Sequence, residues 1–217
     1  ERLTDLEQAG ARLEAIAQRT ESGQSREAAV RVEAILAQVQ RDGDAALLEL
    51  TERFDGVRPD PLRVPAEQLE AAWAATPADL QAALKLAHRR IVEFHQRQKP
   101  ADLAMTGAHG ERLGRRWRPV ERAGLYVPGG RASYPSTVLM NAVPATVAGV
   151  QRLVMVTPPG PDGRVNQTVL AAAHLAGITE IYRVGGAQAI GALAYGTESI
   201  PRVDVISGPG NLYVTLA

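Results

Sequence analysis

The sequence contains no cysteine and has no excess of charge of either sign. The missing cysteines exclude a disulfide framework, a thiolate metal site and a cysteine nucleophile within these 217 residues. Because Lys plus Arg and Asp plus Glu number 24 each, no overall field attracts nucleic acid or an acidic membrane surface. We therefore expect no nucleic-acid partner.

A long uninterrupted apolar run is also missing. The longest mostly apolar stretch, residues 136–150, contains Asn141 and Pro144 and falls short of the roughly 18 to 20 residues of a membrane-spanning helix. The amino terminus is charged throughout and does not resemble a signal peptide. These features predict a cytoplasmic protein without a membrane partner.

Common nucleotide-binding and hydrolase motifs are absent as well. The dinucleotide fingerprint GxGxxG is not formed at the most suggestive place, because Tyr213 stands where the third glycine after Gly208 and Gly210 belongs. There is no GxxxxGK[ST], which argues against an ATPase of the P-loop kind. HExxH and GxSxG do not occur either.

The first hundred residues have helical periodicity. The predicted helices of this half are residues 4–19, 26–41 and 44–54. Gly56 offers a left-handed stop to the third of them, and three prolines mark a loop over residues 57–65. A further long helix is predicted to begin with Thr76 as cap and Pro77 in the first turn, with Phe94 on its apolar face.

Residues 112–118, RLGRRWR, are strand-like and strongly basic. They allow two interpretations, a phosphate-binding patch or a solvated edge strand whose arginines discourage aggregation.

From Ala123 onward short apolar runs alternate with helical segments. The apolar runs are residues 123–127, 152–156, 180–184 and 203–206. Each gap between them is long enough for a crossover helix, and such connections make neighbouring strands parallel. Runs this apolar are typical of strands covered on both faces. The pattern predicts a doubly wound α/β domain.

Each predicted strand is followed by a turn rich in glycine or proline. These turns are residues 128–131, 157–160, 185–188 and 208–211. Ligands of open parallel sheets bind beyond the carboxyl ends of the strands, where all of these turns fall. Glycine lets the backbone approach a ligand, and the next helix begins with unpaired N–H groups that suit a phosphate. We expect a nucleotide or dinucleotide crevice at this edge, with SGPGN (residues 207–211) as one wall.

Three polar residues at this edge have a structural alternative from pattern alone. Asn211 is an ordinary helix N-cap residue, and Gln188 can act as a capping-box partner. Tyr126 lies between two apolar residues of a strand, which also suits a core aromatic with a hydrogen-bonded hydroxyl.

Three long motifs resemble the histidinol dehydrogenase family, in the same order: GLYVPGGRASYPSTVLMNAVPATVAGV, HLAGITEIYRVGGAQAIGALAYGTESIP and VDVISGPGNLYV. The resemblance runs from Val120 to the end, and the helical half fits more loosely. It implies an α/β protein with a helical amino-terminal region followed by a Rossmann-like parallel-sheet domain, in an aldehyde-dehydrogenase-like architecture.

Members of the family oxidise L-histidinol through the aldehyde to L-histidine with two NAD⁺ at a zinc site, as homodimers. Carried onto this sequence, the resemblance implies that Tyr126, Gln188 and Asn211 contact NAD. Because the family's Rossmann-like domain lacks GxGxxG, the missing fingerprint does not count against NAD.

Members of that family are much longer than 217 residues, and their zinc ligands and Glu-His acid-base pair come after the position of Ala217. No catalytic or metal-binding residue is therefore assigned here. We expect residues 1–119 to form a helical region of a domain completed by downstream sequence, and residues 120–217 to form a Rossmann-like NAD-binding domain truncated at its carboxyl end. The helix that opens at Asn211 has only six further residues, which also predicts the front part of a longer protein, inactive by itself.

Two alternatives to this function stay open on the sequence. One is a paralogous dehydrogenase that acts on another alcohol, such as a sulfonated diol. The other is a catalytically inert module that binds nucleotides or mediates oligomerisation.

Overall fold

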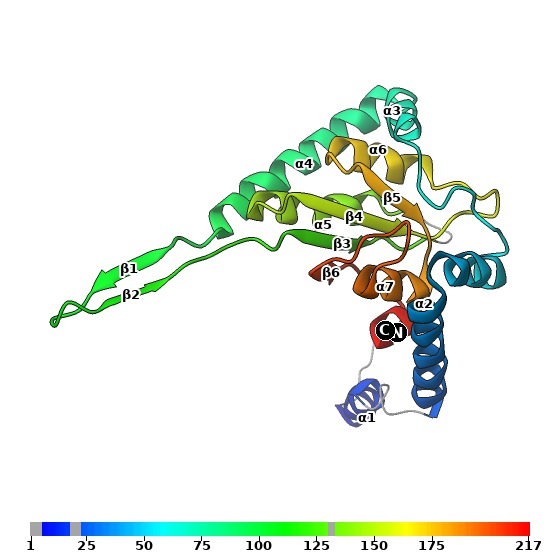
Figure 1. Ribbon diagram of the computed structural model, residues 1–217, viewed down its shortest axis with the longest axis horizontal. Helices are drawn as coiled ribbons and strands as arrows, with labels where there is room; N and C mark the ends of the chain where they lie inside the picture. The colour runs from blue at the N-terminus through cyan, green and yellow to red at the C-terminus, as the bar shows by residue number, and fades with distance from the viewer. Residues whose placement is uncertain (1–5, 18–22, 130–132) are drawn as a thin grey trace.

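The computed structural model describes residues 6–17, 23–129 and 133–217. Its helices are α1 (Leu6–Ala17), α2 (Gly23–Asp55), α3 (Ala66–Ala74), α4 (Ala78–Gln98), α5 (Pro135–Ala148), α6 (Gln167–Leu175), α7 (Gly186–Tyr195) and α8 (Leu212–Leu216). Its strands are β1 (Leu103–Thr106), β2 (Arg112–Arg115), β3 (Arg122–Tyr126), β4 (Arg152–Thr157), β5 (Glu180–Arg183) and β6 (Val205–Ser207). The predicted mixed α/β class, with helices first and alternating elements after them, is confirmed (Figure 1).

Strands β3 to β6 form one parallel sheet in the order β5-β4-β3-β6. The chain starts in the middle of this sheet, moves outward to β5 and crosses back to place β6 beside β3. Leu125 pairs with Met155 and Met155 pairs with Ile181, which fixes the register of the inner strands. The predicted strands and their parallel direction are confirmed. This order creates a topological switch point between β3 and β6, where doubly wound folds bind ligands.

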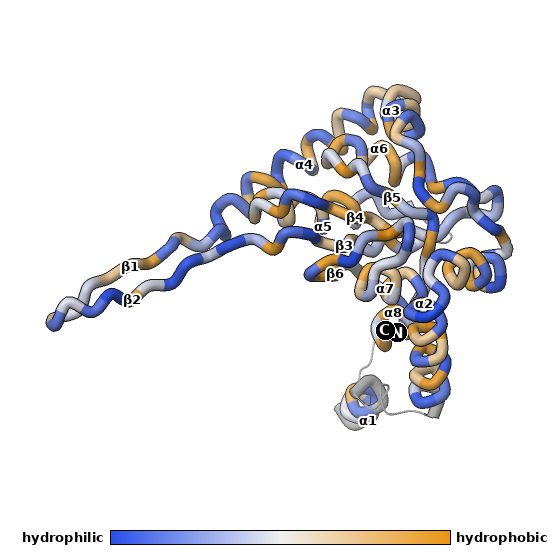
Figure 2. The backbone as a smooth tube through the Cα atoms, viewed as in Figure 1, coloured by the Kyte–Doolittle hydropathy of each residue, from blue (hydrophilic) through white to orange (hydrophobic). Residues whose placement is uncertain are grey.

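Helices cover both faces of the sheet, as strands this apolar require. On one face Leu125, Met155 and Ile181 pack against α5 and α6, and α3 and α4 extend the same core. On the other face Val154 and Val156 belong to a core shared with α2, α7 and α8. Figure 2 shows hydrophobic residues along the central strands and the helices beside them. Helices of the first hundred residues therefore contribute to both outer layers.

Helix α2 is kinked at Gly43, whose φ of 56° and ψ of −131° lie outside the helical region. The sequence predicts two helices here, and the kink falls between them. The second part begins at Asp44, whose N–H donates to the Glu198 carboxylate at 2.7 Å and whose own carboxylate accepts from the Ser199 hydroxyl. It ends at the predicted stop, Gly56, with a φ of 75°. Contacts with the segment after α7 thus hold the second part in place.

The proline-rich segment after α2 lies along the outer edge of β5. The Val64 N–H donates to the Ile181 carbonyl and the Arg183 N–H donates to the Leu62 carbonyl, both at 2.8 Å. The predicted loop over residues 57–65 is confirmed, and it also covers the edge strand of the sheet. The second part of α2 is therefore held in place at its start by the contacts of Asp44 and after its end by the pairing of residues 62–64 with β5.

Two expectations for the next region are wrong. Thr76 does not cap α4, because its hydroxyl donates to the Ala72 carbonyl at 2.7 Å and so belongs to the end of α3, a helix that the sequence analysis did not predict. Phe94 is not on the buried face of α4, since 59% of it is exposed. Leu84, Ile91 and other residues of α4 do pack against the core.

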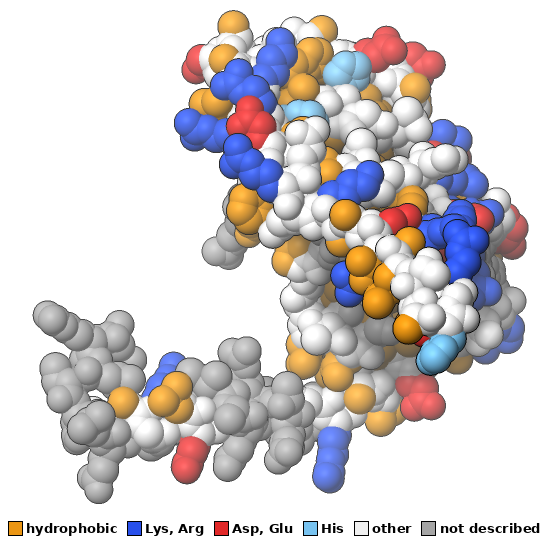
Figure 3. All heavy atoms as spheres, turned by 90° about the vertical axis from the view of Figure 1, so that its left-hand side faces the viewer, with side chains coloured by type: hydrophobic (Ala, Val, Ile, Leu, Met, Phe, Trp, Pro, Cys, Tyr) orange, Lys and Arg blue, Asp and Glu red, His pale blue; other side chains and the backbone are white. Residues whose placement is uncertain are grey.

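Strands β1 and β2 form an antiparallel ribbon that projects away from the rest of the molecule (Figure 1). Every residue of both strands is exposed, which is compatible with both interpretations of residues 112–118, a solvated strand and a phosphate-binding patch. Met105 and Leu113 are directly paired and lie on one face of the ribbon. Figure 3, seen from the side of the ribbon, shows hydrophobic and basic side chains exposed together.

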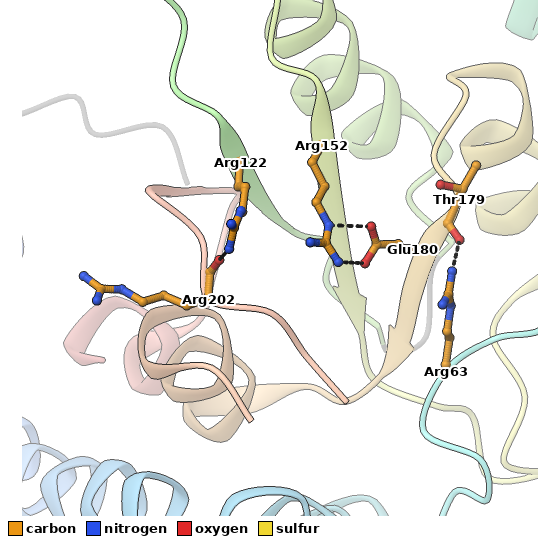
Figure 4. A network of polar contacts seen from close by, with 6 residues as sticks. All are labelled: Arg63, Arg122, Arg152, Thr179, Glu180 and Arg202. Atoms are coloured by element: carbon orange, nitrogen blue, oxygen red, sulfur yellow. Dashed lines mark hydrogen bonds and ion pairs between the residues drawn. The ribbon is translucent and has the colours of Figure 1, made fainter. Parts of the chain in front are cut away.

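Polar contacts join the elements at the amino ends of the parallel strands (Figure 4). Arg152, the first residue of β4, donates two hydrogen bonds of 2.7 and 2.8 Å to the carboxylate of Glu180, the first residue of β5. Arg122, the first residue of β3, donates to the carbonyl of Arg202 at 3.3 Å. This edge of the sheet is therefore stabilised by partners within the fold. Among the described residues, no helix is both long and apolar enough to cross a membrane.

Candidate functional site

A cleft of about 1220 Å³ lies at the carboxyl ends of the parallel strands. Its walls include residues from each of the turns that follow β3, β4, β5 and β6 and from both parts of α2. Tyr126, Gln188 and Asn211 all line it. The structure thus brings together the residues that the sequence analysis singled out, along the edge where the strand order places a ligand site.

Tyr126, the last residue of β3, is 4% exposed, and its hydroxyl accepts a hydrogen bond from the Gly186 N–H at 3.2 Å. Burial raises the pKa of the Tyr126 hydroxyl; the Gly186 hydrogen bond opposes this and the charge of Asp55 adds to it. The hydroxyl therefore keeps its proton at neutral pH. Since none of the described residues accepts that proton, Tyr126 can donate a hydrogen bond to a ligand.

Gln188 lies in the first turn of α7 and is 1% exposed. Its side-chain amide has no hydrogen-bond partner among the described residues. The capping-box alternative is not borne out, because Gly185 is the N-cap of α7 and no side chain caps this helix. The amide is not among the side-chain atoms that are fully buried without a partner, Thr51 Oγ1 and Arg183 Nε, so it keeps some exposure and can hydrogen-bond a ligand in the cleft.

Asn211 precedes α8 and acts as its N-cap, with its side-chain oxygen accepting from the Val214 N–H at 3.1 Å. The structural alternative for this residue is therefore confirmed. The cap uses only the side-chain oxygen, because no described residue accepts a hydrogen bond from the Asn211 amide nitrogen. Asn211 can therefore cap the helix with its oxygen and, at the same time, donate a hydrogen bond from its amide nitrogen to a ligand in the cleft.

The first turn of α7 forms part of the cleft wall through residues 186–188. Gly186 has a φ of 64°, and a Cβ on it would come within 2.6 Å of the Gln188 side-chain oxygen. Glycine is therefore required for both the turn and the position of the amide. Backbone N–H groups and the positive end of the helix dipole meet at this turn, which suits a phosphate group.

Helix α2 supplies the part of the cleft that the sequence analysis missed. Arg31, Arg53, Phe54 and Asp55 line it. The Arg53 guanidinium lies 5.4 Å from the centre of the Phe54 ring, and 51% of Phe54 is exposed. Burial raises the pKa of the half-buried Asp55 carboxyl. No local sequence pattern places these residues here, because their position depends on the kink at Gly43.

These residues fit a dinucleotide and do not form a metal site. A glutamine amide without a hydrogen-bond partner among the described residues, a protonated tyrosine and the first turn of a helix line one cleft. Over the parts of the chain that the structure describes, no three His, Cys, Asp or Glu residues are grouped so as to hold a metal ion.

Comparisons with known proteins identify close relatives. The family model for histidinol dehydrogenase matches residues 18–217. Histidinol dehydrogenase of Parasynechococcus marenigrum (strain WH8102) is 64% identical over 98% of this chain and 49% of the relative. That of Gloeobacter violaceus (strain ATCC 29082 / PCC 7421) is 52% identical over 99% of this chain and 49% of the relative.

The chain is also similar in structure to a solved member of the same family. The crystal structure of histidinol dehydrogenase from Elizabethkingia anophelis superposes with a TM-score of 0.82 at 39% sequence identity, over 85% of this chain and 42% of that one. The chain spans about half the length of the curated relatives it matches.

Proposed function

The chain belongs to the histidinol dehydrogenase family, and we propose that the complete protein oxidises L-histidinol to L-histidine through L-histidinaldehyde, the last steps of histidine biosynthesis, with this part holding NAD. The observation that carries the proposal is that Tyr126, Gln188 and Asn211 line the same cleft. The names of the relatives favour L-histidinol over a sulfonated diol as the substrate.

In this proposal the chain binds and orients the coenzyme. NAD supplies a hydride acceptor when it is bound. The first turn of α7 holds the pyrophosphate, because its N–H groups and dipole favour negative charge. Gln188 hydrogen-bonds the coenzyme with an amide that no described residue engages, and Tyr126 and Asn211 donate a hydroxyl and an amide proton.

Further parts of the proposal rest on the resemblance to the family. We assign zinc and the acid-base pair to sequence after Ala217, and no step is attributed to them here. We also propose a homodimer, a cytoplasmic location, an aldehyde-dehydrogenase-like architecture and a division into residues 1–119 and 120–217. The 217 residues by themselves should then be inactive.

The direct test is NADH formation by the complete gene product from L-histidinol and NAD⁺, followed by absorbance. We expect two molecules of NADH for each histidinol consumed, since oxidation of an alcohol to an acid transfers two hydrides. A protein that yields no NADH from histidinol would overturn the proposed activity.

A variant tests the assignment of the cleft. Gln188→Leu should raise the KM for NAD⁺ about tenfold, since it removes a hydrogen-bonding amide of similar size. The KM for histidinol should change little. Thermal stability should change little, because the Gln188 amide has no hydrogen-bond partner among the described residues to lose. Gln167→Leu in the first turn of α6, where the glutamine is exposed, is the matched control and should leave all these values unchanged.

A further inference from the structure

Asp55 is an acidic residue in a place where the fold gains nothing from its charge. It is the last residue of α2, where the negative end of the helix dipole disfavours a carboxylate. It is half-buried, and burial raises the pKa of its carboxyl. The end of the helix does not need the Asp55 carboxylate either. The next residue, Gly56, ends the helix, and its N–H donates to the Glu52 carbonyl at 3.0 Å.

The cations around Asp55 do not pair with it. Arg58 forms a salt bridge with Glu52 at 3.1 Å, and the Arg53 guanidinium lies over the Phe54 ring. No described residue forms a hydrogen bond or an ion pair with the Asp55 carboxylate. The two oxygens of this carboxylate are therefore available to a ligand.

Asp55 lines the same cleft as Gln188, whose amide also has no hydrogen-bond partner within the described parts of the chain. Phe54, next to Asp55 in the sequence, lines the cleft with half of its surface exposed. An exposed aromatic ring offers a flat apolar surface to a base. A carboxylate beside it accepts hydrogen bonds from two neighbouring hydroxyl groups, as acidic residues do with ribose in other dinucleotide sites.

We propose that Asp55 makes the cleft selective for NAD⁺ over NADP⁺, by accepting hydrogen bonds from the adenosine ribose hydroxyls while Phe54 packs against the adenine. This inference rests on the proposed function, because it assumes that the cleft binds a dinucleotide. A phosphate on the 2′-hydroxyl removes one of the two donors and brings a negative charge against the carboxylate. Arg53, two residues earlier and also in the cleft, is the cation that such a phosphate would meet once Asp55 is neutral.

The experiment is a comparison of KM values for NAD⁺ and NADP⁺ in the complete enzyme and its Asp55→Asn variant, which keeps the size of the side chain. The KM for NAD⁺ should rise about tenfold, because a hydrogen bond to a charged acceptor is lost. The KM for NADP⁺ should fall, so that the preference for NAD⁺ shrinks by roughly ten- to a hundredfold.

The matched control is Glu52→Gln, which makes the same change of charge on the same helix at a residue outside the cleft. It should leave the preference within about twofold of the wild type. If Asp55→Asn also leaves it within about twofold, or raises both KM values equally, the proposal is wrong. Failure of the wild type to use NAD⁺ would instead overturn the proposed function.

Melting temperature separates recognition from a structural role. Since burial raises the pKa of Asp55, its neutral amide replacement should not lower the melting temperature. A fall of several degrees in Asp55→Asn would mean that the carboxylate serves the fold, and it would overturn the proposal.

Discussion

The two edges of the parallel sheet differ in how fully their polar side chains are paired. At the amino edge Arg152 and Glu180 form two hydrogen bonds with each other, and Arg122 bonds a backbone carbonyl (Figure 4). At the carboxyl edge Gln188 is 1% exposed and Asp55 half-buried, yet neither has a hydrogen-bond or ion-pair partner among the described residues. The polar groups of the amino edge bond within the fold, whereas the carboxyl edge holds paired groups such as Arg183 and Ser207 beside two groups that a ligand can still bind.

This difference leads to different expected effects of mutation. A polar substitution at the amino edge should change stability and its pH dependence but not coenzyme binding. A polar substitution at the carboxyl edge should change coenzyme binding with little loss of stability, unless the residue also serves the backbone. The following variants of the complete protein test these expectations.

The largest effect is expected at Gly208, in the turn after β6. Its φ is 145°, and a Cβ there would overlap the backbone carbonyl oxygen of Tyr126. Gly208→Ala should lower the free energy of unfolding by about 3 kcal/mol, because it forces β6 and β3 apart where they support the cleft. The KM for NAD⁺ should rise as well. Urea denaturation and coenzyme kinetics measure the two effects.

Gly163→Ala is the control for Gly208→Ala. Gly163 also has a positive φ, 75°, but its Cβ would meet no atom within 4 Å. The strained φ alone should cost about 1 kcal/mol. Equal losses in the two variants would contradict a close approach of the turn to Tyr126.

An intermediate effect is expected at Asn211, which serves both the backbone and the cleft. Asn211→Ala should cost about 1 kcal/mol of stability through loss of the α8 cap. It should also raise the KM for NAD⁺ several-fold and leave the affinity for histidinol nearly unchanged. Unaltered coenzyme kinetics would remove Asn211 from the site.

Asn211→Ser separates the two roles of this residue. Serine restores the cap but not the amide N–H₂. Stability should therefore recover while the KM for NAD⁺ stays raised. Recovery of both would show that only the cap matters.

The smallest effect is expected at the amino edge, for Glu180→Gln. The Arg152 hydrogen bonds hold the pKa of Glu180 below its ordinary value. The contribution of the pair is thus present above the ordinary pKa of a glutamate and is lost as the pH falls through the lowered one. Because the Arg152 side chain is 44% exposed and solvent therefore screens the pair, we expect a loss below about 1 kcal/mol near neutral pH.

Two measurements check Glu180→Gln. The difference in melting temperature between the variant and the wild type should shrink in acid. The KM for NAD⁺ should be that of the wild type, and a raised KM would contradict the separation of the two edges.

Much of the sheet could be predicted from the sequence, because its signals are local. Apolar runs such as residues 152–156 are too short for helices and are separated by helical segments, which requires a parallel sheet. The turns after them lie at one edge for topological reasons. Tyr126 and Gln188 follow from this placement together with the family resemblance, and both line the cleft.

The contribution of α2 to the cleft could not be predicted in this way. Periodicity places a helix end near Asp55, but the direction of that helix depends on the kink at Gly43 and on the contacts of Asp44 with residues 198 and 199. Such contacts join parts of the chain more than a hundred residues apart. The prediction of Thr76 as the cap of α4 was wrong for a related reason. Its hydroxyl donates to the Ala72 carbonyl of the preceding helix and does not accept from an N–H of the next one.

The most direct test of the cleft as the coenzyme site is a crystal structure of the complete protein with NAD⁺. We expect the pyrophosphate at the first turn of α7, with the Gln188 amide within hydrogen-bonding distance of the coenzyme and Tyr126 and Asn211 beside it. NAD⁺ bound elsewhere, with Gln188 still without a partner, would contradict it.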